Sequence, residues 1–435
     1  MRCPGLVLLL ALSLAPGAHA QTREVRIDIA GGGRRTQLYC EAFAAGRLPA
    51  GAPAGHEADE VLAGDLEQSA VFLVSRAWAG QPPFDVQAVT GGRWKAEGGQ
   101  LVLEGEVRDF PARRPILSRV YRGPVATWRS LVHRFADDIV LQFTGEPGVS
   151  GTRIAFVAVE GRNKELWVMD LDGADARPLT RDRSIALSPS WSPDGSLIVF
   201  SSYRDGGPPH LYVVPGTGGK LYQISARPAL NTSPAYSPDG REIACTLSKD
   251  GNSEIYVLDA RGGSPRRLTD NRAIDTSPCW SPTGREIAFT SDRSGAPQVH
   301  VMDRDGGNVR RLTYEVSYTD SPAWSPRGDL IAFVSRTGSG FDIYVCAADG
   351  ADPRLVVSGS SNENPRWSPD GRHLVFASNR EGPYALFVTD LDGRPPRKLD
   401  TGGRVAMSPS WSPSPYRTAA AVQTDAPNTN PGGNR

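Results

Sequence analysis

The side chains most able to carry out chemistry are few in this sequence and lie far apart. No G-x-S-x-G motif is present to supply a serine nucleophile. Gly31-Gly32-Gly33 leads into two arginines rather than into a helix that would bind phosphate. The histidines after the first twenty residues show no metal-binding spacing; they are His56, His133, His210, His300 and His373. We therefore predict a protein that is not an enzyme and that holds neither a cofactor nor a metal ion.

Asp-Gly pairs are the pattern closest to a cation site. They occur at Asp172-Gly173, Asp349-Gly350 and Asp392-Gly393. A calcium loop needs oxygen ligands spread over about twelve residues, and that spacing is absent around these pairs. Asp-Gly also favours tight turns between strands. The sequence predicts hairpin turns here.

A six-residue unit, Ser-Pro-x-Trp-Ser-Pro with small variations, sets the fold. Its start-to-start spacings are 45, 44, 44, 43 and 44 residues. A period of about 40 to 50 residues is the signature of propeller blades. One aromatic residue per blade at a fixed place favours packing between blades over a binding role. The units begin at Ser188, Ser233, Ser277, Ser321, Asn364 and Ser408.

Short β-rich runs fill each period and predict four antiparallel strands per blade. The runs Ile154 to Val157, Leu166 to Met169 and Arg177 to Thr180 have no unit before them, and the last unit has no strands after it. We therefore expect residues 407–412 to supply the innermost strand of the first blade, which leaves no open sheet edge. The predicted fold class is an all-β six-bladed β-propeller, preceded by a small mixed α/β domain.

The N-terminus predicts a signal peptide over residues 1–20, with an apolar run after Arg2 and the cleavage site Ala18-His19-Ala20. No later segment approaches the ~20 apolar residues of a membrane span, so no spanning helix is expected.

Behind the signal peptide we predict an α/β domain at 21–146, the propeller at 152–413 and a disordered tail at 414–435. Thr127 is expected to cap the second helix of the α/β domain. The other predicted elements are strands at Val25–Ile29, Leu38–Phe43, Leu101–Val107 and Ile116–Tyr121 and a helix between Ala58 and Ala70.

The net charge limits the classes of binding partner, and the spacing of the cysteines bears on disulfide bonds. Lys+Arg and Asp+Glu are both 48, so no single-sign field draws the chain to nucleic acid or to an anionic membrane. Cys40, Cys245, Cys279 and Cys346 are scattered and are expected to be small buried hydrophobes. A bridge between Cys245 and Cys279 is left open.

Surface recognition remains, and the propeller predicts its place. The loop before each innermost strand surrounds one mouth of the central channel, and these loops mix polar and apolar residues, as a protein partner requires. Turn chemistry alone would also select Asn, Asp and Thr at such positions. The predicted mouth residues are Leu230, Asn231, Thr232, Asp275, Thr276, Thr319, Asp320, Asn362 and Glu363.

The arrangement over residues 21–413 resembles the TolB family of periplasmic propeller proteins. The opening segment Glu24, Val25, Arg26 and Ile27, the entry Thr152-Arg153-Ile154-Ala155 and the final Trp-Ser-Pro unit carry the resemblance. The tail after Pro413 and the Gly- and Arg-rich stretch 31–35 depart from the family pattern.

The resemblance implies a monomeric periplasmic protein of the Tol-Pal envelope system, with roles in outer-membrane integrity and cell division. It implies that a Pal-like peptidoglycan-associated lipoprotein binds the mouth, and that a TolA-like inner-membrane protein binds Glu24 to Ile27. Pal binding would bias whether that segment is packed or released. The alternatives are a secreted propeller hydrolase and a carbohydrate-binding propeller.

Overall fold

The computed structural model describes residues 35–76, 82–83, 85–338 and 340–415. The predicted signal peptide, the strand at Val25–Ile29 and the segment Glu24 to Ile27 lie outside the described residues, as does the tail from residue 416. Contacts group the chain from Arg35 onward into one compact unit.

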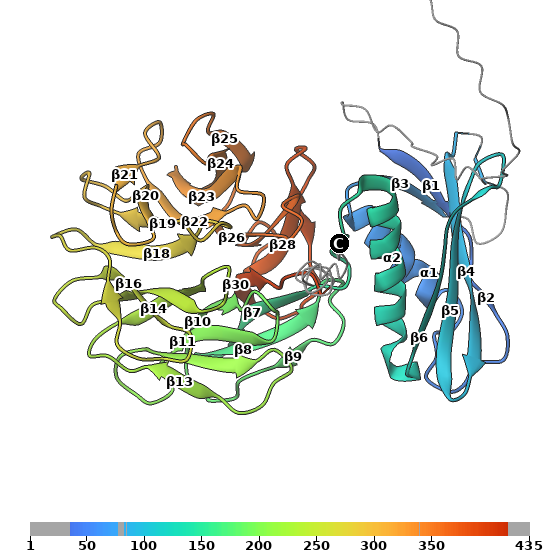
Figure 1. Ribbon diagram of the computed structural model, residues 1–435, viewed down its shortest axis with the longest axis horizontal. Coiled ribbons are helices and arrows are strands. Elements are labelled where there is room, and N and C mark those ends of the chain that lie inside the picture. Colours follow the sequence, from blue (N-terminus) through green and yellow to red (C-terminus); the bar gives the residue numbers. More distant parts are fainter. Residues whose placement is uncertain (1–34, 77–81, 84, 339, 416–435) are drawn as a thin grey trace, which may run out of the picture. The chain divides into compact units, whose positions relative to one another are not determined.

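Six four-stranded antiparallel sheets form the blades of a β-propeller, and in five of them the strands follow sequence order from inside to outside (Figure 1). This arrangement confirms the fold predicted from the repeat. Five sheets are continuous in sequence: β10 (Ala186–Trp191), β11 (Leu197–Ser202), β12 (His210–Pro215) and β13 (Tyr222–Ser225); β14 (Asn231–Tyr236), β15 (Glu242–Leu247), β16 (Glu254–Asp259) and β17 (Arg266–Arg267); β18 (Asp275–Trp280), β19 (Glu286–Ser291), β20 (Gln298–Asp303) and β21 (Arg310–Arg311); β22 (Thr319–Trp324), β23 (Leu330–Thr337), β24 (Gly340–Ala347) and β25 (Arg354–Val357); β26 (Asn362–Trp367), β27 (His373–Ser378), β28 (Ala385–Asp390) and β29 (Arg397–Lys398).

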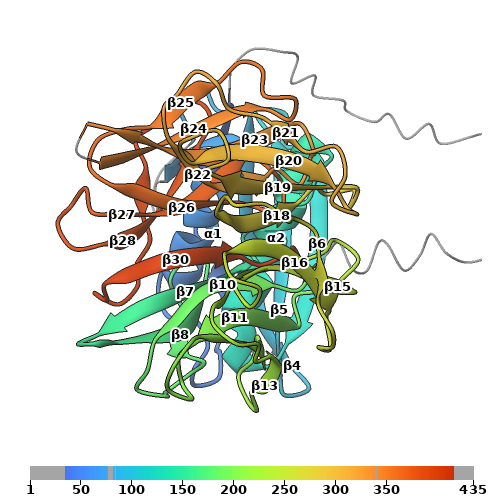
Figure 2. The same cartoon turned by 90° about the vertical axis from the view of Figure 1, so that its left-hand side faces the viewer.

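The sixth sheet joins the two ends of the propeller. Its order is β30 (Ala406–Trp411), β7 (Arg153–Glu160), β8 (Asn163–Asp170) and β9 (Arg177–Pro178). Antiparallel pairing sets Met407 opposite Val157 and Trp411 opposite Ile154. Each inner strand contacts the next one, and β30 also contacts β10, so the ring closes (Figure 2).

Each inner strand carries the same backbone irregularity. Ser188 has φ 51° and Asn364 has φ 53°, and the pairing register with the second strand shifts at these points. Left-handed φ is uncommon outside glycine, so its recurrence at the first residue of every unit shows that the β-bulge is a regular feature of this fold. The bulge explains why Ser or Asn always precedes the proline. The residues with this φ are Ser188, Ser233, Ser277, Ser321, Asn364 and Ser408.

The aromatic residue of each unit packs between blades. The five tryptophans at this position are only 6% to 8% exposed. The Trp191 indole donates to the Ser410 carbonyl at 3.2 Å, and the Trp367 indole donates to the Ala323 carbonyl at 2.9 Å, in both cases across a blade boundary. A structural role for the repeated Trp is therefore confirmed.

The N-terminal domain is one mixed sheet with helices packed on it (Figure 1). Its path is β3-β1-β4-β5-β6, with β1 parallel to β3 and β4, and with β5 antiparallel to β4 and β6. Off this path, β2 pairs with β4 in parallel. Helix α2 buries Leu131, Val132, Phe135 and Ile139 against the sheet. The elements are β1 (Thr36–Cys40), β2 (Ala44–Ala45), α1 (Glu57–Gln68), β3 (Phe72–Arg76), β4 (Ala88–Glu97), β5 (Gln100–Asp109), β6 (Pro115–Gly123), the 3-10 turn η1 (Val125–Thr127) and α2 (Trp128–Thr144).

Two details of this domain differ from the prediction. Strands β3 and β4 were not predicted. Thr127 precedes α2 as expected, but its hydroxyl donates to the Pro124 carbonyl and caps no helical N–H. The preceding 3-10 turn redirects that hydroxyl, because its i to i+3 geometry brings the Pro124 carbonyl within reach.

None of the described helices is long and apolar enough to cross a membrane. Three of the four cysteines are buried as predicted, and the fourth is not. Cys40, Cys245 and Cys346 are buried, Cys279 is partly exposed, and all four are free, so the bridge between Cys245 and Cys279 does not form.

Candidate functional site

The second residue of each inner strand is partly exposed at the mouth of the propeller. Because the six inner strands have the same place in equivalent blades, these residues form a ring at one end of the channel. The ring combines two apolar, two threonine and two acidic side chains, a mixture suited to a protein partner. We name it the mouth ring: Leu187, Thr232, Thr276, Asp320, Glu363 and Met407.

The first residue of each inner strand is buried instead. Asn231, Asp275, Thr319 and Asn362 have no exposed surface. Successive residues of a strand point to opposite sides, so only one residue of each adjacent pair can face the mouth. Although the sequence predicts these four as binding residues, the structure places their side chains inside the blades.

Hydrogen bonds explain why these buried positions are polar. The Asn231 amide oxygen accepts from Ser225 Oγ at 2.8 Å and from the Arg227 N–H at 3.1 Å. A guanidinium donor, Arg293, reaches Asp275 at 2.7 Å. The bonds of Asn231 hold the loop that enters β14, and the bond of Asp275 ties the start of β18 to the residues after β19, which pairs these buried polar groups.

Apolar side chains lie just outside the mouth ring. Leu230 is 40% exposed and Ile274 is 53% exposed, and each directly precedes an inner strand. Leu230 belongs to the predicted set. Ile274 occupies the matching position one blade later, in a loop expected at the mouth, but it was not among the predicted binding residues.

The two acidic residues of the mouth ring are oriented by neighbours. Asp320 Oδ1 accepts from Thr290 Oγ1 at 2.8 Å and from the Ser321 N–H at 2.6 Å. Glu363 Oε1 accepts from Ser361 Oγ at 3.0 Å and also from the Tyr384 hydroxyl. Held carboxylates lose little rotamer freedom on binding, which favours contact with a cationic or hydrogen-bonding partner group.

A buried charge cluster lies away from the mouth, around His133 of α2. His133 Nδ1 lies 2.7 Å from Asp65 Oδ2, and Nε2 lies 3.6 Å from Asp172 Oδ2. Burial alone would lower the pKa of His133, but the carboxylates of Asp65, Asp172 and Asp170 outweigh it and raise that pKa to about 9.

Within the described residues, His133, Asp170 and Asp172 are also the one group whose ligand atoms could surround a metal ion, all within 4.8 Å of one another. Arg129 donates to Asp172, and Arg153 lies 3.5 Å from Asp170. Protein cations already balance these carboxylates, so we interpret the cluster as an ion-pair network.

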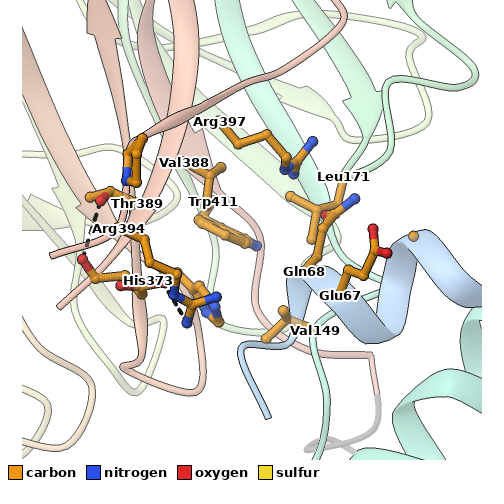
Figure 3. A pocket seen from close by; sticks show the side chains of 13 residues that line it. Glu67, Gln68, Val149, Leu171, His373, Val388, Thr389, Arg394, Arg397 and Trp411 are labelled. Carbon is orange, nitrogen blue, oxygen red and sulfur yellow. Dashed lines mark hydrogen bonds and ion pairs between the residues drawn. The ribbon is translucent and has the colours of Figure 1, made fainter. Parts of the chain in front are cut away.

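A cavity of about 290 Å³ lies near the end of α1, with Glu67 and Gln68 facing Arg397 and Trp411 (Figure 3). Its Arg394 pairs with Asp390 at 2.6 Å. His373 and Thr389 line the same cavity.

The fold defines this chain as a six-bladed β-propeller protein with mixed polar and apolar side chains partly exposed at one mouth. The family model of the TolB beta propeller domain matches residues 140–415, and the chain belongs to this family.

Individual relatives agree. The "Tol-Pal system protein TolB" of Anaeromyxobacter dehalogenans is 38% identical over 56% of this chain and 59% of its own length. That of Desulfosudis oleivorans is 38% identical over 38% of this chain and 37% of its own length. The matched part therefore spans less than two thirds of these curated relatives.

Among solved structures, TolB from Acinetobacter baumannii superposes with a TM-score of 0.79 at 26% identity. The match covers 88% of this chain and 98% of that one. The similarity thus includes the α/β domain as well as the propeller.

Proposed function

We propose that this protein is a periplasmic, non-enzymatic component of a Tol-Pal envelope system. In this proposal it binds a Pal-like lipoprotein at the propeller mouth and a TolA-like inner-membrane protein through the segment Glu24 to Ile27. These interactions support outer-membrane integrity and constriction during division. Membership of the TolB propeller family and the Tol-Pal names of its relatives support this assignment.

The observation that carries the proposal is the chemistry of the mouth. Leu230 and Ile274 present apolar surface, while Asp320 and Glu363 present oriented carboxylates. Exposed apolar groups beside polar ones are the composition of a protein-binding patch. A nucleophile with an adjacent base, which a hydrolase would need, is not found among the described mouth residues.

Titration calorimetry against the periplasmic domain of Pal from the same organism tests the mouth. About half of the Ile274 side chain is exposed and can be covered by a partner. Covering it should contribute about 1 kcal/mol to the binding free energy, or ~5-fold in Kd. The double variant L230A/I274A should weaken binding ~30-fold, at about 2 kcal/mol.

Leu355→Ala is the matched control, because Leu355 is 49% exposed on the outermost strand β25, away from the mouth. It should leave Pal affinity unchanged. Equal affinities for wild type and L230A/I274A would remove the mouth from the proposal, and no saturable binding in the micromolar range would remove Pal itself.

The TolA contact is tested separately by deleting residues 21–29. Loss of TolA binding with altered Pal affinity is expected if the segment switches between packed and released states. Unchanged affinities for both partners would contradict the switch.

A further inference from the structure

The six inner strands enclose a channel with a cavity volume of about 650 Å³. The third residue of each repeat unit lines it, and at five of six positions that residue is small. The exception is Arg366. The residues at this position are Ser190, Ala235, Cys279, Ala323, Arg366 and Ser410.

The Arg366 guanidinium is poorly compensated. Its hydrogen bond goes to the carbonyl of its own neighbour, Pro365, at 2.8 Å. Among the described residues no carboxylate lies within 4 Å of it. Burial lowers the pKa of Arg366, while Cys279 and, to a smaller extent, Asp320 oppose that shift. Arginine nevertheless stays protonated in proteins, so the channel contains a cation without a counter-charge.

The rest of the lining favours an anion. None of the lining residues is Asp, Glu, Lys or His, so nothing negative competes for Arg366 inside the channel. Hydroxyl and amide groups line the same cavity, including Ser190, Ser410 and Asn364. Such groups donate hydrogen bonds to an oxyanion, and a guanidinium fork binds two of its oxygens at once.

We propose that the channel holds one small inorganic oxyanion of the phosphate or sulfate type, bound by the Arg366 guanidinium and the surrounding hydroxyl groups. Arg366 is the fifth residue of β26, three residues beyond the mouth-ring residue Glu363. A free ion needs only to diffuse past the mouth ring, whereas a carboxylate on a partner protein must bring part of its own chain into the channel. The inference is independent of the proposed partners.

Inorganic phosphate is the probe. Calorimetry on the purified protein should show one site, and Arg366→Ala should weaken it at least tenfold. Arg366→Lys keeps the charge but loses the fork, so its affinity should be intermediate. Arg285→Ala removes the same charge from an exposed turn and should bind phosphate like the wild type.

Cys279 provides a second readout that does not depend on stability changes. It lines the channel and is partly exposed, whereas Cys40, Cys245 and Cys346 are buried. The rate of Cys279 alkylation is measured by peptide mapping. Phosphate should slow it at least threefold in the wild type and should not slow it in Arg366→Ala.

Three results would overturn the proposal. One is the absence of phosphate binding in the wild type; another is equal binding by Arg366→Ala. The third is protection of Cys279 by the Pal domain but not by phosphate, which would assign Arg366 to a carboxylate of the partner.

Discussion

Replacing His133 by Gln should change how the stability of the α/β domain depends on pH. His133 is 3% exposed and joins α2 to Asp65 of α1, at 2.7 Å. Asp172, Asp170 and Arg129 are the other charged groups around it. Glutamine retains a hydrogen-bonding group of similar length but cannot become positively charged.

The raised pKa fixes the size of the effect. Folding moves the pKa of His133 from 6.5 to about 9. At about 1.4 kcal/mol per unit, the charged imidazole contributes about 3 kcal/mol to the free energy of unfolding. Because the folded pKa is the higher one, this contribution is complete below pH ~6.5 and disappears as the pH rises through ~9.

Urea unfolding followed by ellipticity at 222 nm measures the change, because both described α-helices belong to this domain. Between pH 6 and pH 9.5 the free energy of unfolding of the wild type should fall by about 3 kcal/mol more than that of His133→Gln. His56→Gln is the control, since solvent screens the half-exposed pair of His56 with Asp59. The same loss in wild type and His133→Gln would refute a charged, buried imidazole.

Two further substitutions test packing. Trp411→Ala should destabilise the propeller by about 3–5 kcal/mol in chemical denaturation, because it empties a buried site in the closing strand. Leu355 is exposed, so the control Leu355→Ala should cost under ~0.5 kcal/mol. Gly105→Ala should cost about 1–3 kcal/mol in thermal unfolding, because its Cβ would lie 2.7 Å from the Phe135 ring, whereas helical Gly64→Ala meets nothing within 4 Å and should add about 0.5–1 kcal/mol. Equal melting temperatures for the two glycine variants would contradict the close approach.

The propeller could be predicted because its determinants are local and repeated. Each of the first five units is followed by its own turn, such as Asp194-Gly195, where the Gly195 N–H donates to the Ser192 carbonyl at 2.9 Å. Repetition turns six weak signals into one strong signal, and the unmatched first strands and last unit indicate the closure.

The α/β domain was harder to predict because glycines interrupt β4, one of its two longest strands. Gly91 and Gly92 lie in the middle of β4, where glycine normally weakens a strand prediction. The structure gives the reason, since a Cβ on Gly92 would lie 2.8 Å from the Glu104 carbonyl oxygen of β5. That close approach is tertiary and leaves no local signal.

The candidate site shows that departures from a repeat carry more functional information than the repeat itself. Positions shared by all blades, such as the Trp, are explained by packing, so they say little about partners. The mouth-ring residue differs in chemistry from blade to blade, whereas the buried residue before it holds the loop. The alternation of side chains along a strand could have predicted this difference between Thr232 and Asn231. Arg366 is the strongest departure, because a charged residue replaces a small one at a channel position where the fold requires no charge. The blade does not need this arginine for packing, and burying its charge costs desolvation free energy. A group outside the blade is therefore expected to compensate the charge.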